Sequence, residues 1–213
     1  MYKRQVHGIG NDRAWTGVGQ GMAPEETSQL MIVSSRDDGR TWSAPRNITP
    51  QVKDPSWSLT LQGPGRGITM RDGTLVFPIQ YIDSTRVPNA GVMYSPDHGQ
   101  TWRTHRFAKS NTTESQVAEP APGVLMLNMR DNRRTGRAVF TTRDLGRTWT
   151  EHASSGALRE PVCMASLLHV PAERNVLGRD VLLFSNPDTT KGRNHVTVKA
   201  SLDGGYTLSL IHI

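Results

Sequence analysis

The chain has 213 residues, of which 35% are hydrophobic and 21% charged, and its formal net charge is +6. This length permits one large all-β unit or two small domains. The basic balance fits a polyanion binder, an acidic-sugar binder or a soluble basic protein, but no run of Lys and Arg is interleaved with aromatic residues, so nucleic-acid binding has no support beyond charge. No stretch of about 18 apolar residues occurs, so no transmembrane segment is predicted.

Short β-type runs follow one another along the chain and are separated by turn residues. They cover residues 30–34, 73–78, 91–94, 124–127, 139–142, 181–185 and 196–199. No apolar segment with a helical period competes with them, so the chain is predicted to be all-β. The apolar run at 161–168, which holds the single cysteine Cys163, is interpreted as a buried strand with a core thiol. One cysteine also excludes an internal disulfide and a multi-cysteine zinc site.

A motif that we call the Asp box recurs in the chain. It reads Ser-Arg-Asp-Asp-Gly-Arg-Thr-Trp at 35–42, returns at 95–102 and 142–149, and has a fourth copy at 201–207 without the Trp. Its aspartates lie 60, 47 and 59 residues apart (97 − 37, 144 − 97 and 203 − 144) at Asp37, Asp97, Asp144 and Asp203. This is the spacing of a four-stranded propeller blade with loop insertions, so one continuous β-propeller domain is predicted.

The Asp box is interpreted as a folding device. Its Asp carboxylate can accept backbone N–H bonds within its own turn, its Gly can adopt a positive φ, and its Trp can pack on the hairpin. Because binding and structural propellers carry such boxes as well, the motif indicates a fold and leaves the function open.

Both ends of the chain are predicted to be foreign to the domain. Residues 208–213 match the translation of a transposase-based sequencing adapter, and residues 1–5 match its opposite strand. We therefore expect the propeller to occupy residues 6–207 and to be cut from a longer gene at both sides.

A charged hairpin is the main candidate for chemistry. Glu114 stands at the start of one predicted strand and Arg130 at the end of the next, and a turn at 119–123 joins the two. Antiparallel pairing puts these two positions at the same edge of a sheet, where a carboxylate and a guanidinium would face one pocket. The alternative is a surface ion pair without chemistry.

The stretch 111–130 closely resembles the bacterial-type exo-α-sialidase family, as do the Gly-Pro-Gly segment at 57–68 and the first Asp box with its flanks at 32–48. The resemblance covers residues 6–207. It implies a six-bladed β-propeller, of which this chain holds material for between three and four blades.

The resemblance implies roles for individual residues. Glu114 matches the carboxylate that activates the nucleophile, and Arg130 matches the second member of an arginine triad that binds the substrate carboxylate. Arg193, in the loop after the strand at 181–185, matches the third member, with neighbouring Lys191 as the competing cation. Glu119 is expected to be structural.

Two further residues fall where the family lines its pocket for the side chains of the sugar. Gln80 and Tyr81 are therefore candidate substrate contacts, against the alternative of ordinary polar residues at a strand end. Tyr81 is not expected to be the nucleophile, because the family's Tyr lies after the third Arg.

By the same resemblance, the parent protein is expected to be a retaining exo-α-sialidase with a Tyr nucleophile, acting on terminal sialic acid of glycoproteins, glycolipids or oligosaccharides. Neither a metal nor another cofactor is expected, since no acidic cluster has the spacing of a calcium loop. Secretion, a periplasmic location or cell-surface display is expected for the family.

The first triad Arg, the acid/base Asp and the Tyr have no match in the chain, so we expect the chain alone to be inactive and to aggregate or stay partly unfolded. The alternative function is a non-catalytic Asp-box propeller that binds glycans or proteins.

Overall fold

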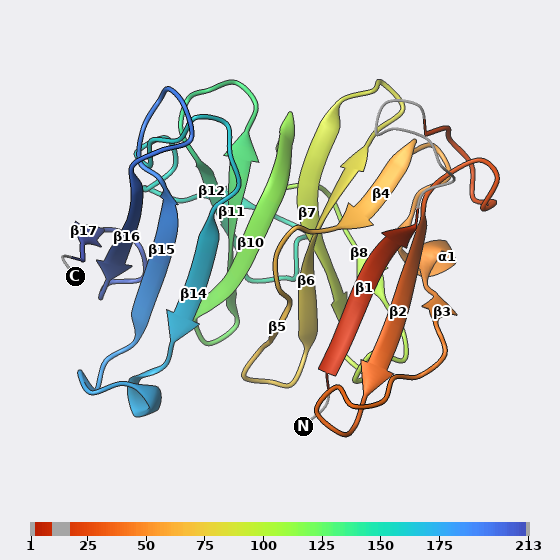
Figure 1. Cartoon of the computed structure of the whole chain (residues 1–213), viewed down its shortest axis with the longest axis horizontal. Coiled ribbons are helices and arrows are strands. Elements are labelled where there is room, and N and C mark those ends of the chain that lie inside the picture. The colour runs from red at the N-terminus through yellow and green to blue at the C-terminus, as the bar shows by residue number, and fades with distance from the viewer. Residues whose placement is uncertain (1–2, 10–17, 212–213) are drawn as a thin grey trace.

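The computed structural model describes residues 3–9 and 18–211, and nearly all of its regular structure is antiparallel β-sheet (Figure 1). The first sheet contains β1 (Lys3–Ile9), β2 (Gln29–Ser35) and β3 (Arg46–Asn47). The second contains β4 (Leu59–Gln62), β5 (Ile68–Thr69), β6 (Leu75–Ile82), β7 (Pro88–Ser95), β8 (Arg103–Thr104) and β9 (Lys109–Ser110).

Two four-stranded sheets complete the described chain. The third sheet contains β10 (Thr112–Ala121), β11 (Val124–Asp131), β12 (Ala138–Thr142) and β13 (Thr150–Glu151). The fourth contains β14 (Ser166–Val170), β15 (Val181–Pro187), β16 (Val196–Ser201) and β17 (Ser209–Leu210). The described helices are short, α1 (Thr49–Val52) and the 3-10 turn η1 (Ala172–Arg174), and none is long and apolar enough to cross a membrane.

The sheets repeat one design, because each Asp box joins two paired antiparallel strands of its sheet, namely β2 and β3, β7 and β8, β12 and β13, and β16 and β17. The order β10-β11-β12-β13 recurs as β14-β15-β16-β17 and as β4-β6-β7-β8, while the first sheet has three described strands. The all-β propeller class predicted from the sequence is confirmed. The number of blades in the whole protein stays a prediction.

Hydrophobic side chains fill the spaces between successive sheets, which stand side by side in Figure 1. Leu125 and Leu127 of β11 pack towards the second sheet, whereas Met126 between them packs towards the fourth. Successive residues of a strand point to opposite faces, and both faces of an inner sheet are covered. This explains why the strands read as continuous apolar runs.

The Asp boxes have the structural role that the sequence predicts. In the first box, Asp37 accepts bonds from the Thr41 hydroxyl (2.6 Å), the Thr41 N–H (2.9 Å) and the Ser35 hydroxyl (2.7 Å). Gly39 has a φ of 89°, as expected, and Asp38 before it also has a positive φ of 61°. The same bonds recur around Asp97, Asp144 and Asp203.

We predict that these boxes lose their stabilising effect in acid. Bonds from the Thr41 hydroxyl and N–H lower the pKa of Asp37 to about 2 from its ordinary 3.8. A carboxyl with a lowered folded pKa stabilises the fold above its unfolded pKa and loses that effect as the pH falls through the folded value. The difference in melting temperature between the wild type and Asp37→Asn should therefore be full at pH 5 and shrink between about pH 4 and pH 2. Glu173→Gln, outside the boxes, is the control, and a constant difference for Asp37→Asn would contradict the prediction.

A side chain of the first sheet also holds the second Asp box. Arg46 of β3 donates to the carbonyl oxygens of Gly99 and Gln100 in the second box, the latter at 2.8 Å. Replacement of Arg46 by Ala is predicted to lower the free energy of unfolding by about 1 kcal/mol, because charged donors to these carbonyls are lost. Urea denaturation followed by tryptophan fluorescence measures this change. Arg40→Ala, an exposed position in the first box, should change it little, and equal effects of the two substitutions would argue against a fastening role.

The prediction of a buried strand at 161–168 is wrong. Strand β14 begins only at Ser166, and Cys163 is half-buried in the preceding loop. The backbone of Cys163 is bonded to side chains instead of to a neighbouring strand: its N–H donates to Glu160 (2.8 Å) and its carbonyl accepts from Arg137 (2.7 Å).

The predicted foreign origin of the ends stays a prediction. Residues 3–9 form β1 and 209–210 form β17, and residues 1, 2, 212 and 213 lie outside the described ones.

Candidate active site at the open rim of the sheets

The candidate site lies at the end of the sheets opposite the Asp boxes, where β10 begins and β11 ends (Figure 1). Thr112 pairs with Asp131 and Ser115 with Met129, so the register slips by one residue between Thr112 and Ser115. Glu114 sits in this bulge. A bulge bends a strand and re-aims the side chain that it carries, which here turns Glu114 towards the end of β11.

The structure brings Glu114 and Arg130 together. The Oε2 atom of Glu114 lies 2.7 Å from Nη1 of Arg130, and the two side chains are 26% and 25% exposed. Both line a cavity of about 430 Å³ together with Leu61, Gln80 and Asn132. The Nε atom of Arg130 is buried and has no hydrogen-bond partner within the described chain. A carboxylate and an incompletely bonded guanidinium therefore share one partly open cavity.

Gln80 and Tyr81 are placed on opposite faces of β6. Gln80 lines the cavity with Glu114, and its amide donates to the Gly63 carbonyl at 2.6 Å. Tyr81 is 4% exposed in the core and stacks on Trp57 with ring centroids 3.7 Å apart. Burial raises the pKa of Tyr81 above its ordinary value. Consecutive strand residues alternate between faces, so Tyr81 points away from the cavity that Gln80 lines. The position of Tyr81 therefore does not support a substrate contact.

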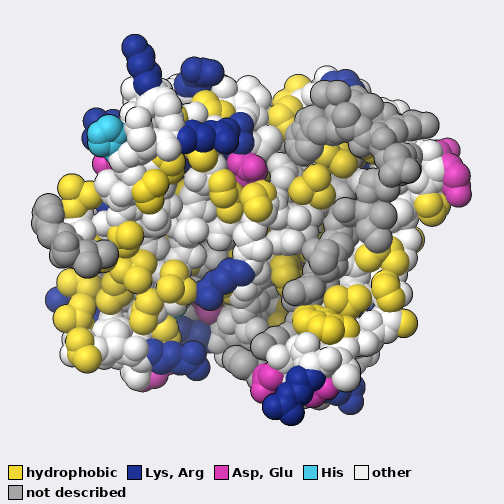
Figure 2. Space-filling model, in the orientation of Figure 1, with side chains coloured by type: hydrophobic (Ala, Val, Ile, Leu, Met, Phe, Trp, Pro, Cys, Tyr) yellow, Lys and Arg dark blue, Asp and Glu magenta, His cyan; other side chains and the backbone are white. Residues whose placement is uncertain are grey.

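Arg193 is exposed in the loop between β15 and β16. This loop lies at the same end of the sheets as the cavity, and Figure 2 shows Lys and Arg side chains gathered there. Arg193 does not line the cavity of Glu114, and neither does Lys191. The structure thus places Arg193 at the same end of the sheets as Arg130 but outside the cavity that Arg130 lines, and its role as a third carboxylate-binding Arg stays a prediction.

Glu119, on the same strand as Glu114, has both carboxylate oxygens occupied by backbone N–H groups. Its two carboxylate oxygens accept the N–H groups of Arg71 (2.8 Å) and Gly123 (2.9 Å). Gly123 belongs to the hairpin between β10 and β11, where its φ is 70°. The bond from Gly123 holds the turn between β10 and β11, and the bond from Arg71 joins this turn to the one between β5 and β6 in the second sheet, as expected of a structural residue.

A buried ion pair behind β11 was missed by the sequence analysis. Arg137 and Glu160 have side chains 0% and 1% exposed, and their charged groups lie 3.2 Å apart. Arg137 also donates to the side-chain oxygen of Asn128 at 2.6 Å, two residues before Arg130. Desolvation lowers the pKa of Arg137, and the charge of Glu160 opposes that shift. This pair holds the strand that carries Arg130 against the segment before β14.

Little in the local sequence indicates this pair. Arg137 follows a Thr-Gly turn and Glu160 precedes a Pro, so both read as exposed loop residues. Only the three-dimensional packing shows them to be buried.

Comparison with known proteins places the chain in a family. The sequence model of the family described as "BNR repeat-like domain" matches residues 10–212. The chain belongs to the BNR repeat-like domain family. A sialidase of Bacteroides fragilis (strain YCH46) is 66% identical over 208 residues, covering 97% of this chain and 38% of that protein. A sialidase of Micromonospora viridifaciens is 30% identical over 94% of this chain and 32% of its own length.

A solved structure agrees with these relatives. The Hadza microbial sialidase Hz136 is 68% identical and superposes with a TM-score of 0.92 over 97% of this chain and 41% of its own. The resemblance to bacterial-type sialidases is therefore confirmed. The chain spans about two fifths of the length of the Bacteroides fragilis protein and of this structure.

Proposed function

We propose that the chain is part of an exo-α-sialidase, which hydrolyses the α-ketosidic bond of terminal sialic acid in glycoproteins, glycolipids or oligosaccharides. The observation that carries this proposal is the pair Glu114 and Arg130, 2.7 Å apart in a cavity of about 430 Å³. Membership of a family whose relatives include sialidases supports it.

The chemistry of the substrate explains this pair. Sialic acid carries a carboxylate on its anomeric carbon, and a guanidinium can hold that group through two parallel charge-assisted bonds. Arg130 takes this role, with Arg193 as a second cation supplied by the loop between β15 and β16. Binding of the substrate carboxylate competes for the Arg130 group that now bonds to Glu114, and so frees Glu114 to accept a proton.

Glu114 then acts as the general base of a retaining reaction. It takes the phenolic proton of a Tyr supplied from outside this chain, and the phenolate oxygen bonds to the anomeric carbon while the glycosidic bond breaks. The leaving oxygen receives a proton from an acid, and water later cleaves the enzyme-bound sugar. A neutral phenol suits this position because a second carboxylate would be repelled by that of the substrate.

Segment exchange tests the proposal. The aligned segment of the Bacteroides fragilis sialidase is replaced by this chain, which matches it at 66% identity, so that the remaining parts of a propeller are present. We expect the purified chimera to release 4-methylumbelliferone from its α-sialoside and sialic acid from sialyllactose. A chimera that folds, as judged by circular dichroism and a cooperative melt, but releases neither would overturn the proposal and favour a non-catalytic propeller.

A further inference from the structure

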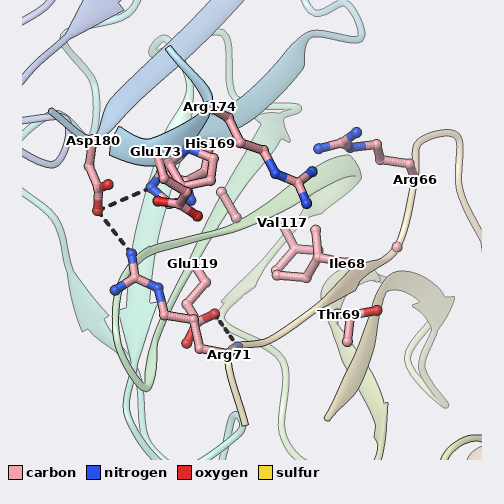
Figure 3. A pocket seen from close by; sticks show the side chains of 13 residues that line it. Arg66, Ile68, Thr69, Arg71, Val117, Glu119, His169, Glu173, Arg174 and Asp180 are labelled. Carbon is pink, nitrogen blue, oxygen red and sulfur yellow. Dashed lines mark hydrogen bonds and ion pairs between the residues drawn. The ribbon is translucent and has the colours of Figure 1, made fainter. Parts of the chain in front are cut away.

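A second cavity opens beside β10 at the end that carries the Asp boxes. Its volume is about 630 Å³, within the range of small-molecule sites, and neither Glu114 nor Arg130 lines it. Its walls come from the segment around β5, from β10 at Val117 to Glu119, and from the loop between β14 and β15 with η1 (Figure 3). It is thus separate from the candidate active site.

Two of the three carboxylates at this cavity are already bonded. Both oxygens of Glu119 accept backbone N–H groups, as described above. Asp180 accepts hydrogen bonds from the N–H of Ala172 and from the guanidinium of Arg71, both at 2.9 Å. It also lies 3.4 Å from Nε2 of His169. Arg71 therefore has a counter-ion within the wall, and Asp180 has little capacity left for another cation.

Two guanidinium groups have no such partner. Arg66 and Arg174 line the cavity from different segments, and in Figure 3 their side chains point towards one another. Within residues 3–9 and 18–211, no hydrogen bond or ion pair involves either guanidinium group. Ile68, which is half-buried, supplies an apolar surface near them, while Val117 is 2% exposed and belongs to the core. Two facing cations above an apolar surface are complementary to an anion that also carries a hydrocarbon face.

We propose that this cavity binds an acidic sugar residue as a second glycan site. The carboxylate of the sugar lies between Arg66 and Arg174, each of which offers a planar pair of N–H donors. The apolar face of the ring rests on Ile68. Glu173, the third carboxylate, lines the same cavity and accepts hydroxyl groups of the sugar. Binding of a sugar at this cavity does not require the catalytic activity proposed for Glu114 and Arg130.

Site-resolved NMR of the complete 213-residue chain tests this site. Amide shifts are followed during titration with glucuronic acid, N-acetylneuraminic acid, neutral N-acetylglucosamine and inorganic phosphate. We expect both sugar acids to shift the amides of Gly67 and Ala118, which line the cavity, with weak affinity that falls as salt is added. The double variant Arg66→Gln/Arg174→Gln should weaken this binding at least about ten-fold.

Two control variants make the result specific. Arg179→Gln removes an exposed charge from the same loop without touching the cavity and should leave the binding unchanged. Arg130→Gln removes the charge of the candidate active site and should leave the Gly67 and Ala118 shifts intact, so that failure of either site is seen separately. Unchanged binding by the double variant, or equal binding of N-acetylglucosamine or phosphate, would overturn the proposal. If the isolated chain aggregates, sugar binding by the same variants is measured by calorimetry in the chimera. Loss of binding in the double variant alone supports the site, and unchanged binding overturns it.

Discussion

Replacement of Glu114 by Gln in the active chimera is expected to lower kcat for the methylumbelliferyl sialoside by about 10²–10⁴-fold, the usual contribution of a positioned general base. The glutamine keeps an oxygen that can accept the 2.7 Å bond from Arg130, so the geometry of the pair is preserved and mainly the basicity is lost. Steady-state kinetics over a range of substrate concentrations separates kcat from KM. The loss should appear in kcat, because the proton moves only as the glycosidic bond breaks.

The matched control for Glu114→Gln is Glu151→Gln. Glu151 is exposed in β13 at the Asp-box end of the sheets and accepts a bond from the Ser155 hydroxyl. The same chemical change there should leave kcat within a factor of about three. If Glu114→Gln behaves like Glu151→Gln, Glu114 is part of a surface ion pair, and the general base must be sought elsewhere.

Local patterns explain why much of the fold could be predicted. The Asp boxes carry their own hydrogen-bonding partners within a few residues, so Asp37 and Thr41 form the same turn wherever the sheet lies. The pairing of Glu114 with Arg130 needed only one hairpin, because antiparallel neighbours meet at a common edge. Both features depend on residues close together in the sequence.

Features that depend on distant segments could not be predicted in this way. The sequence makes Tyr81 and Gln80 equal candidates, since the alternation of a strand does not reveal which face borders the cavity. The apolar run around Cys163 predicts a strand, because nothing in that run shows that Arg137 donates to the Cys163 carbonyl. The cavity of Arg66 and Arg174 joins two segments that have no common motif.

Removal of Arg137 is expected to be the most destabilising single substitution considered for this chain. Arg137→Leu leaves the Glu160 carboxylate, 1% exposed, without its cation, and breaking a buried ion pair on one side costs about 3–5 kcal/mol of unfolding free energy. The carbonyl of Cys163 and the side chain of Asn128 lose their donor as well. Urea denaturation of the folded chimera measures this loss.

The double variant Arg137→Leu/Glu160→Leu separates an unpaired charge from lost packing. Without Glu160 no charge is left buried, so a substantial part of the lost stability should return, since apolar replacements of buried pairs are often tolerated. Sialidase activity should not return to the same extent. Arg137 holds Asn128, two residues before Arg130, so its loss should raise KM for the sialoside even in the stabilised double variant. Recovery of both stability and KM would show that the pair supports the fold alone and does not position Arg130.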